Sequence, residues 1–207
     1  MADAPLVIVG AGGHARVVLE ALLPRLAVGH LSPEPTDDPR LGAHLGGDDT
    51  IATLAGDGHA FALGLGFVDA AGASRRAGVL DLLAGTELVT IVHASAAIAP
   101  SATVGAGTFV AAAAVLGTDV QVGRAAIVNT GAVVDHDCVI GDNAHVAPGV
   151  TLSGGVTVGA NTLIGAGATV IQGITIGAGV VIGAGAVVVS DLPDGVTAVG
   201  VPARITA

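Results

Sequence analysis

The sequence predicts two domains, a small α/β domain in residues 1–93 and a parallel β-helix in residues 94–207. Three observations support this prediction. Strand-like and helix-like segments alternate in the first domain. A glycine-rich turn joins the first strand-like segment to the first helix-like one. From Ile98 to Val188, every sixth residue is Ile, Val or Leu.

The α/β domain begins with a short apolar run, residues 6–9, which has the composition of a buried strand. The segment of residues 16–26 then carries apolar side chains at helical spacing. Alternating strands and helices are typical of a parallel sheet, and this domain has room for about half of a Rossmann fold. The other expected elements are strands at residues 28–31, 60–66 and 88–92, a helix at residues 71–83, and a loop rich in Pro, Gly and Asp at residues 32–49.

The turn before the first helix reads Gly10-Ala11-Gly12-Gly13-His14-Ala15. Gly10, Gly12 and Ala15 satisfy the G-x-G-x-x-G/A spacing of dinucleotide-binding folds. Free N–H groups at a helix N-terminus favour an anion, although a tight turn without a ligand would have the same pattern. NAD is not favoured, because Ser32 stands where such an enzyme has an acidic residue. His14 is placed to hydrogen-bond a sugar hydroxyl or a phosphate.

The six-residue repeat fits neither an α-helix nor a simple alternating strand, and it is typical of a parallel β-helix. One aliphatic side chain per flat side is expected to point into a narrow core. Glycine often follows the aliphatic residue, where it relieves crowding at the corners. Residues 191–204 lie beyond the repeat and are expected to cap the last coil. The sixteen aliphatics are Ile98, Val104, Val110, Leu116, Val122, Val128, Val134, Ile140, Val146, Leu152, Val158, Ile164, Val170, Ile176, Ile182 and Val188.

The composition excludes several classes of function. With a formal net charge of −10 and seven basic residues, the chain is a poor partner for nucleic acid. The mean hydropathy of +0.81 comes from small residues in the repeats, so no membrane insertion is expected even though residues 99–118 are uncharged. No basic segment precedes the first apolar run, so no signal peptide is expected. The single cysteine cannot form an internal disulfide, which favours a cytoplasmic location.

A cluster of ionisable residues interrupts the otherwise bland repeat. His136 is the second residue after the inward Val134, so it should point outward, and Asp135 and Asp137 flank it. A neutral histidine can take a proton from a nucleophile, and an adjacent carboxylate raises its basicity. A simple exposed surface histidine would give the same pattern. Cys138 falls at an inward position and is expected to be core filler and a poor nucleophile.

These features together resemble the hexapeptide-repeat sugar acyltransferases of the sialic-acid O-acetyltransferase and bacillosamine N-acetyltransferase type. The resemblance covers nearly the whole chain. It implies a left-handed β-helix with three hexads per coil, so that residues eighteen apart stack. It also implies acetyl-CoA as co-substrate, a nucleotide-sugar substrate, a homotrimer and a role in cell-surface polysaccharide synthesis. The matching segments are the Gly10–Ala15 turn, Asn129-Thr130, His136, His145 and Gly200-Val201-Pro202-Ala203.

The resemblance implies a role for each matching residue. His136 corresponds to the general base and Asp137 to the acidic residue that tunes it. Gly154 is expected beside His136 one coil further on, with its N–H open to a developing oxyanion. The remaining matches are His145, Ala166 and Ala184 for acetyl-CoA, and Gly12, Gly13, His14 and Gly66 for the nucleotide sugar. Ser32, after the second strand, is also a candidate contact of the nucleotide sugar. Ser32-Pro33-Glu34 departs from the family, which usually has Asp after the second strand.

Half a coil separates His145 from His136, so the two are not expected to face each other within one chain. They would meet only across a subunit boundary. Histidines of neighbouring chains, with His93 as a third ligand, would then resemble the zinc site of carbonic anhydrases built on this solenoid. A third well-placed histidine is otherwise missing, and no metal is expected.

The sequence therefore predicts an acetyl-CoA-dependent N-acetyltransferase of a nucleotide-linked amino sugar, a 4-amino-4,6-dideoxyhexose. The amine attacks the thioester directly, and His136 removes a proton. Two alternatives stay open. One is an O-acetyltransferase of sialic acid or a related sugar, and the other is a non-catalytic solenoid that binds a sugar nucleotide.

Overall fold

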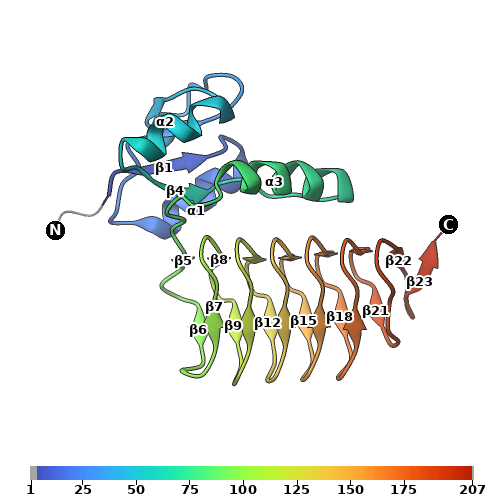
Figure 1. Ribbon diagram of the computed structural model, residues 1–207. Coiled ribbons are helices and arrows are strands. Elements are labelled where there is room, and N and C mark those ends of the chain that lie inside the picture. Colours follow the sequence, from blue (N-terminus) through green and yellow to red (C-terminus); the bar gives the residue numbers. More distant parts are fainter. Residues whose placement is uncertain (1–3, 207) are drawn as a thin grey trace.

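A computed structural model describes residues 4–206. The α/β domain lies against one face of a long β-helix, and its last helix extends along several coils (Figure 1). The two domains therefore share an extended interface.

A four-stranded parallel sheet of order β3-β2-β1-β4 forms the centre of the α/β domain. All four residues of β1 are buried, as expected for a central strand that is covered on both faces. The elements are β1 (Leu6–Val9), α1 (Gly13–Leu22), β2 (Gly29–Leu31), the 3₁₀ turn Pro39–Leu41, β3 (Ala43–His44), the 3₁₀ turn Asp48–Thr50, α2 (Ile51–Gly56), β4 (Ala60–Leu63) and α3 (Ala70–Leu82).

Helix α1 begins and ends earlier than predicted. It starts at Gly13 instead of residue 16, so the second half of the glycine-rich turn is already helical. It ends at Leu22 instead of residue 26, because Pro24 has no N–H with which to continue a helix. Helix α2 was not predicted, since its six residues are too few to show a periodic pattern.

The strand predicted at residues 88–92 belongs to two different sheets. Leu88 forms a single parallel bridge with Phe61 of the α/β sheet. Ile91–Val92, β5, instead pairs with β8 of the β-helix. The prediction of one strand in the α/β sheet is therefore wrong. Val92 lies one hexad before Ile98, so β-helix pairing starts one hexad before the first aliphatic residue of the predicted repeat.

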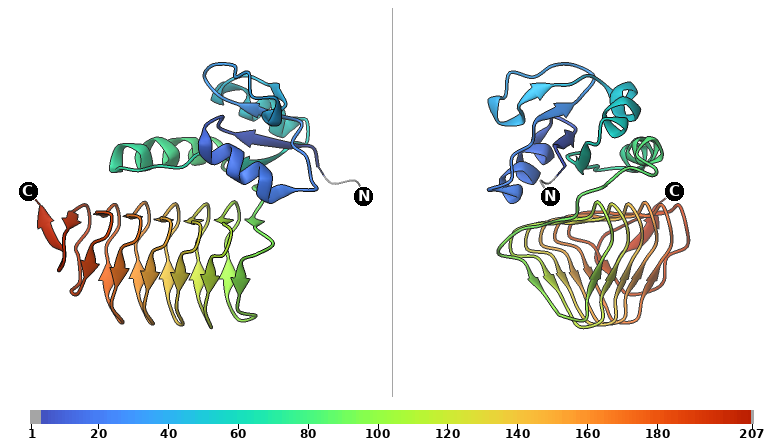
Figure 2. Two further views of the ribbon diagram at one scale, coloured as in Figure 1. Left: turned by 180° about the vertical axis from the view of Figure 1, so that it is seen from behind. Right: turned by 60° about the vertical axis from the view of Figure 1, so that its left-hand side comes forward.

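The β-helix is left-handed and consists of three sheets, whose strands run parallel from coil to coil (Figure 2). Residues eighteen apart pair, as Thr103, Gln121 and Val139 do in successive coils. The five-stranded sheet contains β7 (Thr103–Val104), β10 (Gln121–Val122), β13 (Val139–Ile140), β16 (Thr157–Val158) and β19 (Thr175–Ile176). The six-stranded sheet contains β6 (Ala97–Ile98), β9 (Val115–Leu116), β12 (Val133–Val134), β15 (Thr151–Leu152), β18 (Thr169–Val170) and β21 (Val187–Val188).

The third sheet has eight strands, and it faces the α/β domain. Its last two strands form the predicted cap, because β23 folds back antiparallel on β22. Ala198 and Ala203 of this segment close the end of the apolar core. The strands are β5 (Ile91–Val92), β8 (Phe109–Val110), β11 (Ile127–Val128), β14 (His145–Val146), β17 (Leu163–Ile164), β20 (Val181–Ile182), β22 (Thr197–Val199) and β23 (Arg204–Thr206).

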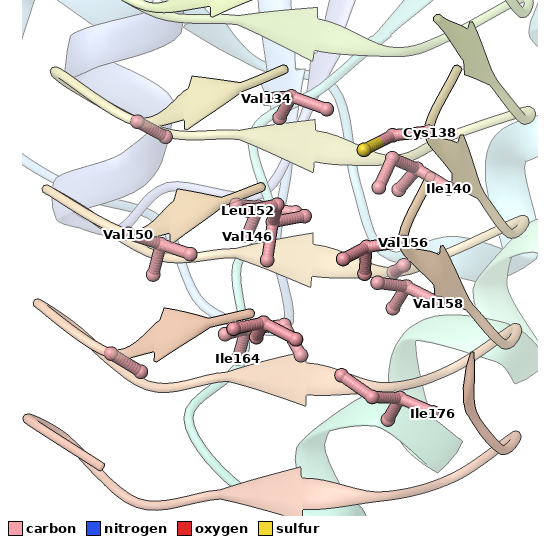
Figure 3. Close-up of a cluster of buried hydrophobic side chains, with 14 of the residues drawn as sticks. Val134, Cys138, Ile140, Val146, Val150, Leu152, Val156, Val158, Ile164 and Ile176 are labelled. Carbon is pink, nitrogen blue, oxygen red and sulfur yellow. The ribbon is translucent and has the colours of Figure 1, made fainter. Parts of the chain in front are cut away.

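The predicted inward register is confirmed. From Val110 to Val188 the repeated aliphatics are buried, and Val146 has no exposed surface. Ile98 and Val104 are partly buried against the same core, because they lie in the first coil. Figure 3 shows several of these side chains meeting in the interior of the solenoid.

Glycines that follow the aliphatics allow the coils to stack closely. A Cβ on Gly165 would lie 2.5 Å from the carbonyl oxygen of Ile182 in the next coil. Other corners require a left-handed backbone, with φ of 71° at Gly155 and 59° at Asp137. Asp137 and Gly155 occupy equivalent corners of adjacent coils, so the repeat places a carboxylate where glycine is otherwise common.

Candidate active site

The glycine-rich turn leaves the N-terminus of α1 open. Gly10 has a φ of 111°, and a Cβ there would lie 2.8 Å from the Leu65 side chain. Ala15 packs against Gly64, where a Cβ would lie 2.7 Å from that of Ala15. The N-cap residue Gly12 supplies no side-chain hydrogen bond, so within residues 4–206 the first amides of α1 have no side-chain acceptor. This arrangement suits an anion at the helix end.

His14, in the first turn of α1, is held as a neutral side chain. Its ring packs edge-on against Phe109 of the β-helix, with the ring centres 5.4 Å apart. Burial, followed by the positive charge of Arg76 and then His145, lowers the pKa of His14 to about 4. Its Nε2 atom is buried and has no hydrogen-bond partner within residues 4–206. Gly66 allows this position, because a Cβ there would lie 3.4 Å from the His14 ring.

Two adjoining cavities open at this edge of the α/β sheet. The first, which we call the His14 cavity, has a volume of about 560 Å³ and reaches from the turn to the β-helix. The second, the Ser32 cavity, has a volume of about 430 Å³ and lies beside the end of β2. Gly66 and Arg75 line both cavities. The predicted residues Gly12, Gly13, His14 and His145 line the His14 cavity, and Ser32 lines the other.

Ser32 takes part in local structure as well as lining its cavity. Its hydroxyl donates to the carbonyl oxygen of Glu34 at 2.6 Å, so the segment after β2 is folded back on itself. His44 contacts the carbonyl oxygen of Ser32 at 2.9 Å. Ser32, which departs from the family pattern, is therefore fixed by hydrogen bonds at the wall of its cavity.

His145 lies on β14, beneath the α/β domain, and ties the two domains together. Its Nδ1 is 2.8 Å from the carbonyl oxygen of Phe67, and its Nε2 is 3.1 Å from the Asn129 side-chain nitrogen. Burial lowers the pKa of His145, and Arg76 lowers it further, whereas the Phe67 carbonyl opposes the shift. The neutral ring therefore donates from Nδ1 and accepts from Asn129 at Nε2.

His136 lies on the corner between β12 and β13 and is exposed. Its Nδ1 is 2.8 Å from Asp137 Oδ2, while its backbone N–H donates to the carboxylate of Asp135. The hydrogen bond to Asp137, followed by the charge of Asp135, raises the pKa of His136. Because Asp137 accepts from Nδ1, the Nε2 atom is left to take a proton from a substrate.

Gly154 lies directly beside the His136 ring, as the stacking predicted. A Cβ at Gly154 would lie 2.5 Å from the ring atoms Cε1 and Nε2, so a larger residue would displace the histidine. Gly155 donates its N–H to the His136 carbonyl at 2.9 Å. Within residues 4–206, the Gly154 N–H has no hydrogen-bond acceptor, so it is available to a ligand.

The two groups of predicted residues lie on different edges of the solenoid. His136 and Gly154 lie between the six-stranded and five-stranded sheets, opposite the sheet that faces the α/β domain. Ala166 and Ala184 are exposed one coil apart on another edge, which follows the eight-stranded sheet. Thr130, which lines the His14 cavity, lies on that same edge. Within one chain, His136 therefore does not reach the His14 cavity.

Cys138 is buried in the core, as predicted. Its thiol donates to the carbonyl oxygen of Ser153 at 3.2 Å, and burial raises its pKa.

His93, the third histidine considered for a metal site, contacts the Ser95 hydroxyl at 2.9 Å. Residues 4–206 contain no group of three or more His, Cys, Asp or Glu side chains placed to hold a metal ion.

The family model for the bacterial transferase hexapeptide (six repeats) matches residues 119–154 and 155–190. Comparison with curated proteins gives no match. A crystal structure of PerB from Caulobacter crescentus, in complex with CoA and GDP-perosamine, is 40% identical over 100% of this chain and 99% of that one, with a TM-score of 0.86. The chain belongs to the hexapeptide-repeat family of sugar N-acyltransferases.

Two further structures extend this likeness. The acetyltransferase domain of PglB from Neisseria gonorrhoeae is 33% identical over 99% of this chain and 100% of that one, with a TM-score of 0.88. WeeI from Acinetobacter baumannii is 26% identical over the same shares of the two chains, with a TM-score of 0.85. As a member of this family, the protein is an acyl-CoA-dependent acetyltransferase that acts on a sugar, with acetyl-CoA as co-substrate. Within residues 4–206, no helix has both the length and the apolar character needed to cross a membrane.

The two arginines of α3 were not among the residues predicted from the sequence. Arg75 lines both cavities, and Arg76 lies buried between the domains. The signal was present, because these are adjacent cations in an acidic chain that has only seven basic residues. Their placement was not predictable, since it depends on how α3 lies on the β-helix.

Proposed function

We propose that the enzyme transfers the acetyl group of acetyl-CoA to the amine of a nucleotide-linked 4-amino-4,6-dideoxyhexose, with His136 as general base. The open N-terminus of α1 between two cavities supports a nucleotide sugar, because this site suits a diphosphate flanked by two larger groups. The likeness to PerB, whose structure contains CoA and GDP-perosamine, supports the same pair of ligands.

The cavities suggest which end of the substrate lies where. The Ser32 cavity is walled by the α/β domain, so it is the place for the nucleoside. The His14 cavity also contains Asn129, Thr130 and His145 of the β-helix, so it is the place for the amino sugar. Gly12, Gly13 and His14 then contact the diphosphate and the sugar, and Gly66 lies between the two cavities.

The His136–Asp137 pair is the observation that carries the proposed chemistry. The amine nitrogen attacks the thioester carbonyl carbon while His136 Nε2 takes a proton from that nitrogen. Asp137 stabilises the imidazolium through Nδ1. The Gly154 N–H faces the oxyanion of the tetrahedral intermediate. The intermediate collapses to the amide and the CoA thiolate, which takes the proton from His136.

A trimer completes this site. His136 of one copy would face the His14 cavity of its neighbour, with acetyl-CoA along the edge that carries Ala166 and Ala184. His145 then lies in the same composite site, close to the acetyl donor. An interface of this kind repeats head to tail and closes into a ring.

The experiment is to incubate the enzyme with acetyl-CoA and a panel of GDP-, UDP- and dTDP-linked 4-amino sugars, following thiol release. Mass spectrometry of the product locates the acetyl group. The control is each matching nucleotide sugar with a hydroxyl in place of the amine. Thiol release with the amino sugars alone is expected. Release with the hydroxyl sugars alone would instead indicate O-acetylation, and no release with either would favour a binding role.

A further inference from the structure

Arg76 is a buried cation that forms no ion pair within residues 4–206. Its Nε donates to the carbonyl oxygen of Leu65, in the α/β domain, at 2.7 Å. Its Nη1 donates to the carbonyl oxygen of Ala125, in the β-helix, at 2.6 Å and to the side-chain oxygen of Asn143. All three acceptors are neutral, so these contacts hold the guanidinium in place without neutralising its charge.

A buried guanidinium without a carboxylate is costly, because burial removes the hydration of the charge. Burial lowers the pKa of Arg76 to about 10, so the side chain stays charged at neutral pH. That charge also lowers the pKa of His14 and of His145, after the larger effect of burial on each. In a chain of net charge −10, this interface is therefore a local positive site.

These contacts leave one nitrogen of the guanidinium without a partner within residues 4–206. Arg76 lines the Ser32 cavity together with Gly10, Ala11 and Arg75. Its Nη2 forms no hydrogen bond within residues 4–206 and is not among the fully enclosed unpaired atoms. Gly12 and Gly13, at the open N-terminus of α1, line the adjoining His14 cavity. Amides of a helix N-terminus and a fixed guanidinium are complementary to a diphosphate.

We propose that Arg76 binds the diphosphate of the nucleotide sugar and also holds the α/β domain on the β-helix. This inference rests on the proposed function and names one contact of its substrate. The neutral acceptors of Arg76 are essential to this role, because a carboxylate partner would compete with the phosphate for the positive charge of the guanidinium. A guanidinium that is already fixed and partly desolvated interacts more strongly with an anion than one in water.

Asn143→Asp separates this role from a purely structural one. The substitution keeps the size of the side chain, and Asp tolerates the φ of 54° at this position. It places a carboxylate on Arg76 Nη1, and it also removes the hydrogen bonds that the Asn143 side-chain nitrogen donates to the Ala73 carbonyl oxygen and to Asn161 Oδ1. The diphosphate would then meet a neutralised cation, whereas a residue that only joins the domains would gain an ion pair without any effect on nucleotides.

The test compares wild type with Asn143→Asp, Arg76→Met and Arg76→Lys by calorimetry. The probes are GDP, UDP and dTDP, the nucleosides guanosine, uridine and thymidine, and inorganic pyrophosphate as a competitor. Arg25→Met is the matched control, because Arg25 donates to the Ala4 carbonyl and lines neither cavity. Thermal melting of each variant verifies that it is folded.

We expect Asn143→Asp and Arg76→Met to weaken nucleoside diphosphate binding about tenfold or more. Nucleoside binding should change about twofold at most, and Arg76→Lys should lie between wild type and Arg76→Met. An unchanged ratio of diphosphate to nucleoside affinity in folded Asn143→Asp would overturn the role of Arg76 alone. If Arg76→Met does not fold, Asn143→Asp and Arg76→Lys still decide whether Arg76 binds the diphosphate. Wild type that binds neither a nucleoside diphosphate nor pyrophosphate would contradict the proposed function itself.

Discussion

At the corner that carries His136, the backbone and the side chains act together. Asp137 has a φ of 59°, in the left-handed region that Asp and Asn tolerate better than most residues. From there its carboxylate reaches the Nδ1 of the preceding residue. The Gly154 position leaves no room for a side chain against the ring. Asp137 therefore orients the His136 ring, and Gly154 in the next coil leaves space for it.

His136→Ala is expected to lower kcat by roughly 10²–10⁴-fold while leaving acetyl-CoA binding intact, because a positioned general base typically contributes that much. Steady-state thiol release and calorimetry with CoA provide the two measurements. Cys138→Ala is the matched control, since the thiol is buried and donates to a backbone carbonyl. Loss of activity in a folded Cys138→Ala protein would argue against direct attack of the amine.

Asp137→Asn is expected to shift the pH dependence of kcat/KM to lower pH. The base must be unprotonated to act, and Asp137 makes the largest contribution to raising the pKa of His136 above 6.5. Activity of wild type should therefore rise with pH through a value above 6.5, and the rise should occur at lower pH in the variant. The plateau should also fall, since the imidazolium loses its partner. Profiles that coincide in pH would exclude Asp137 as the residue that tunes His136.

His136, Asp137 and Gly154 were predictable because the repeat fixes local geometry. Position within a hexad decides whether a residue points inward or outward, and a spacing of eighteen decides which residues stack. The partners of Arg76 were not predictable in this way. Asn143 lies 67 residues from it in sequence, and the contact depends on the packing of two domains.

Among the elements, α1 and its turn form the part whose geometry suits an anion. The helix has no side-chain cap, in contrast to α3, where Asp69 accepts from the Gly72 N–H at 2.6 Å. A helix N-terminus normally has such an acceptor. An absent cap beside two cavities is consistent with a ligand that supplies the missing acceptors.

Gly12→Val is expected to prevent binding of the nucleotide sugar but to spare acetyl-CoA. No protein atom lies within 4 Å of a Cβ at Gly12, and its backbone is extended, so the fold accepts a side chain. The added methyl groups would fill space that a phosphate or sugar needs. Calorimetry with each ligand provides the measurement, and Gly12→Ala should give a smaller loss. Normal binding of both ligands to Gly12→Val would place the acceptor elsewhere.

The face of the β-helix that contacts the α/β domain has its own pattern in the sequence. The outward residue of every third hexad is large, and these residues cover the face beneath the α/β domain. At equivalent positions on the other faces, Gln121 and Thr151 are exposed. The six-residue repeat of inward aliphatics is the same on all three faces of the β-helix, so it cannot show which face the α/β domain covers. The buried outward residues are Ile91, Phe109, Ile127, His145 and Leu163.

For the molecule as a whole, the proposed reaction requires a second copy of the chain, because His136 and the His14 cavity are separated within one copy. The corner of His136 lies opposite the sheet that the α/β domain covers. Val133 and Val139, in the strands on either side of this corner, are 37% and 39% exposed. These residues offer an apolar edge to a neighbouring solenoid. Sedimentation is expected to give a trimer at micromolar concentration, and a monomer would contradict the composite site.

Mixed trimers test the composite site directly. His136→Ala chains lack the base but keep the cavity, whereas Gly12→Val chains keep the base but lose the cavity. Each protein alone should be inactive. After the two are unfolded and refolded together in equal amounts, about a quarter of the sites should pair an intact cavity with an intact base, because each site combines two neighbouring copies of a closed ring. Activity should recover to roughly that fraction of wild type. Refolding the two proteins separately before mixing is the control, and it should restore nothing. If co-refolded trimers stay inactive while co-refolded wild type regains activity, the base and the cavity must act within a single chain.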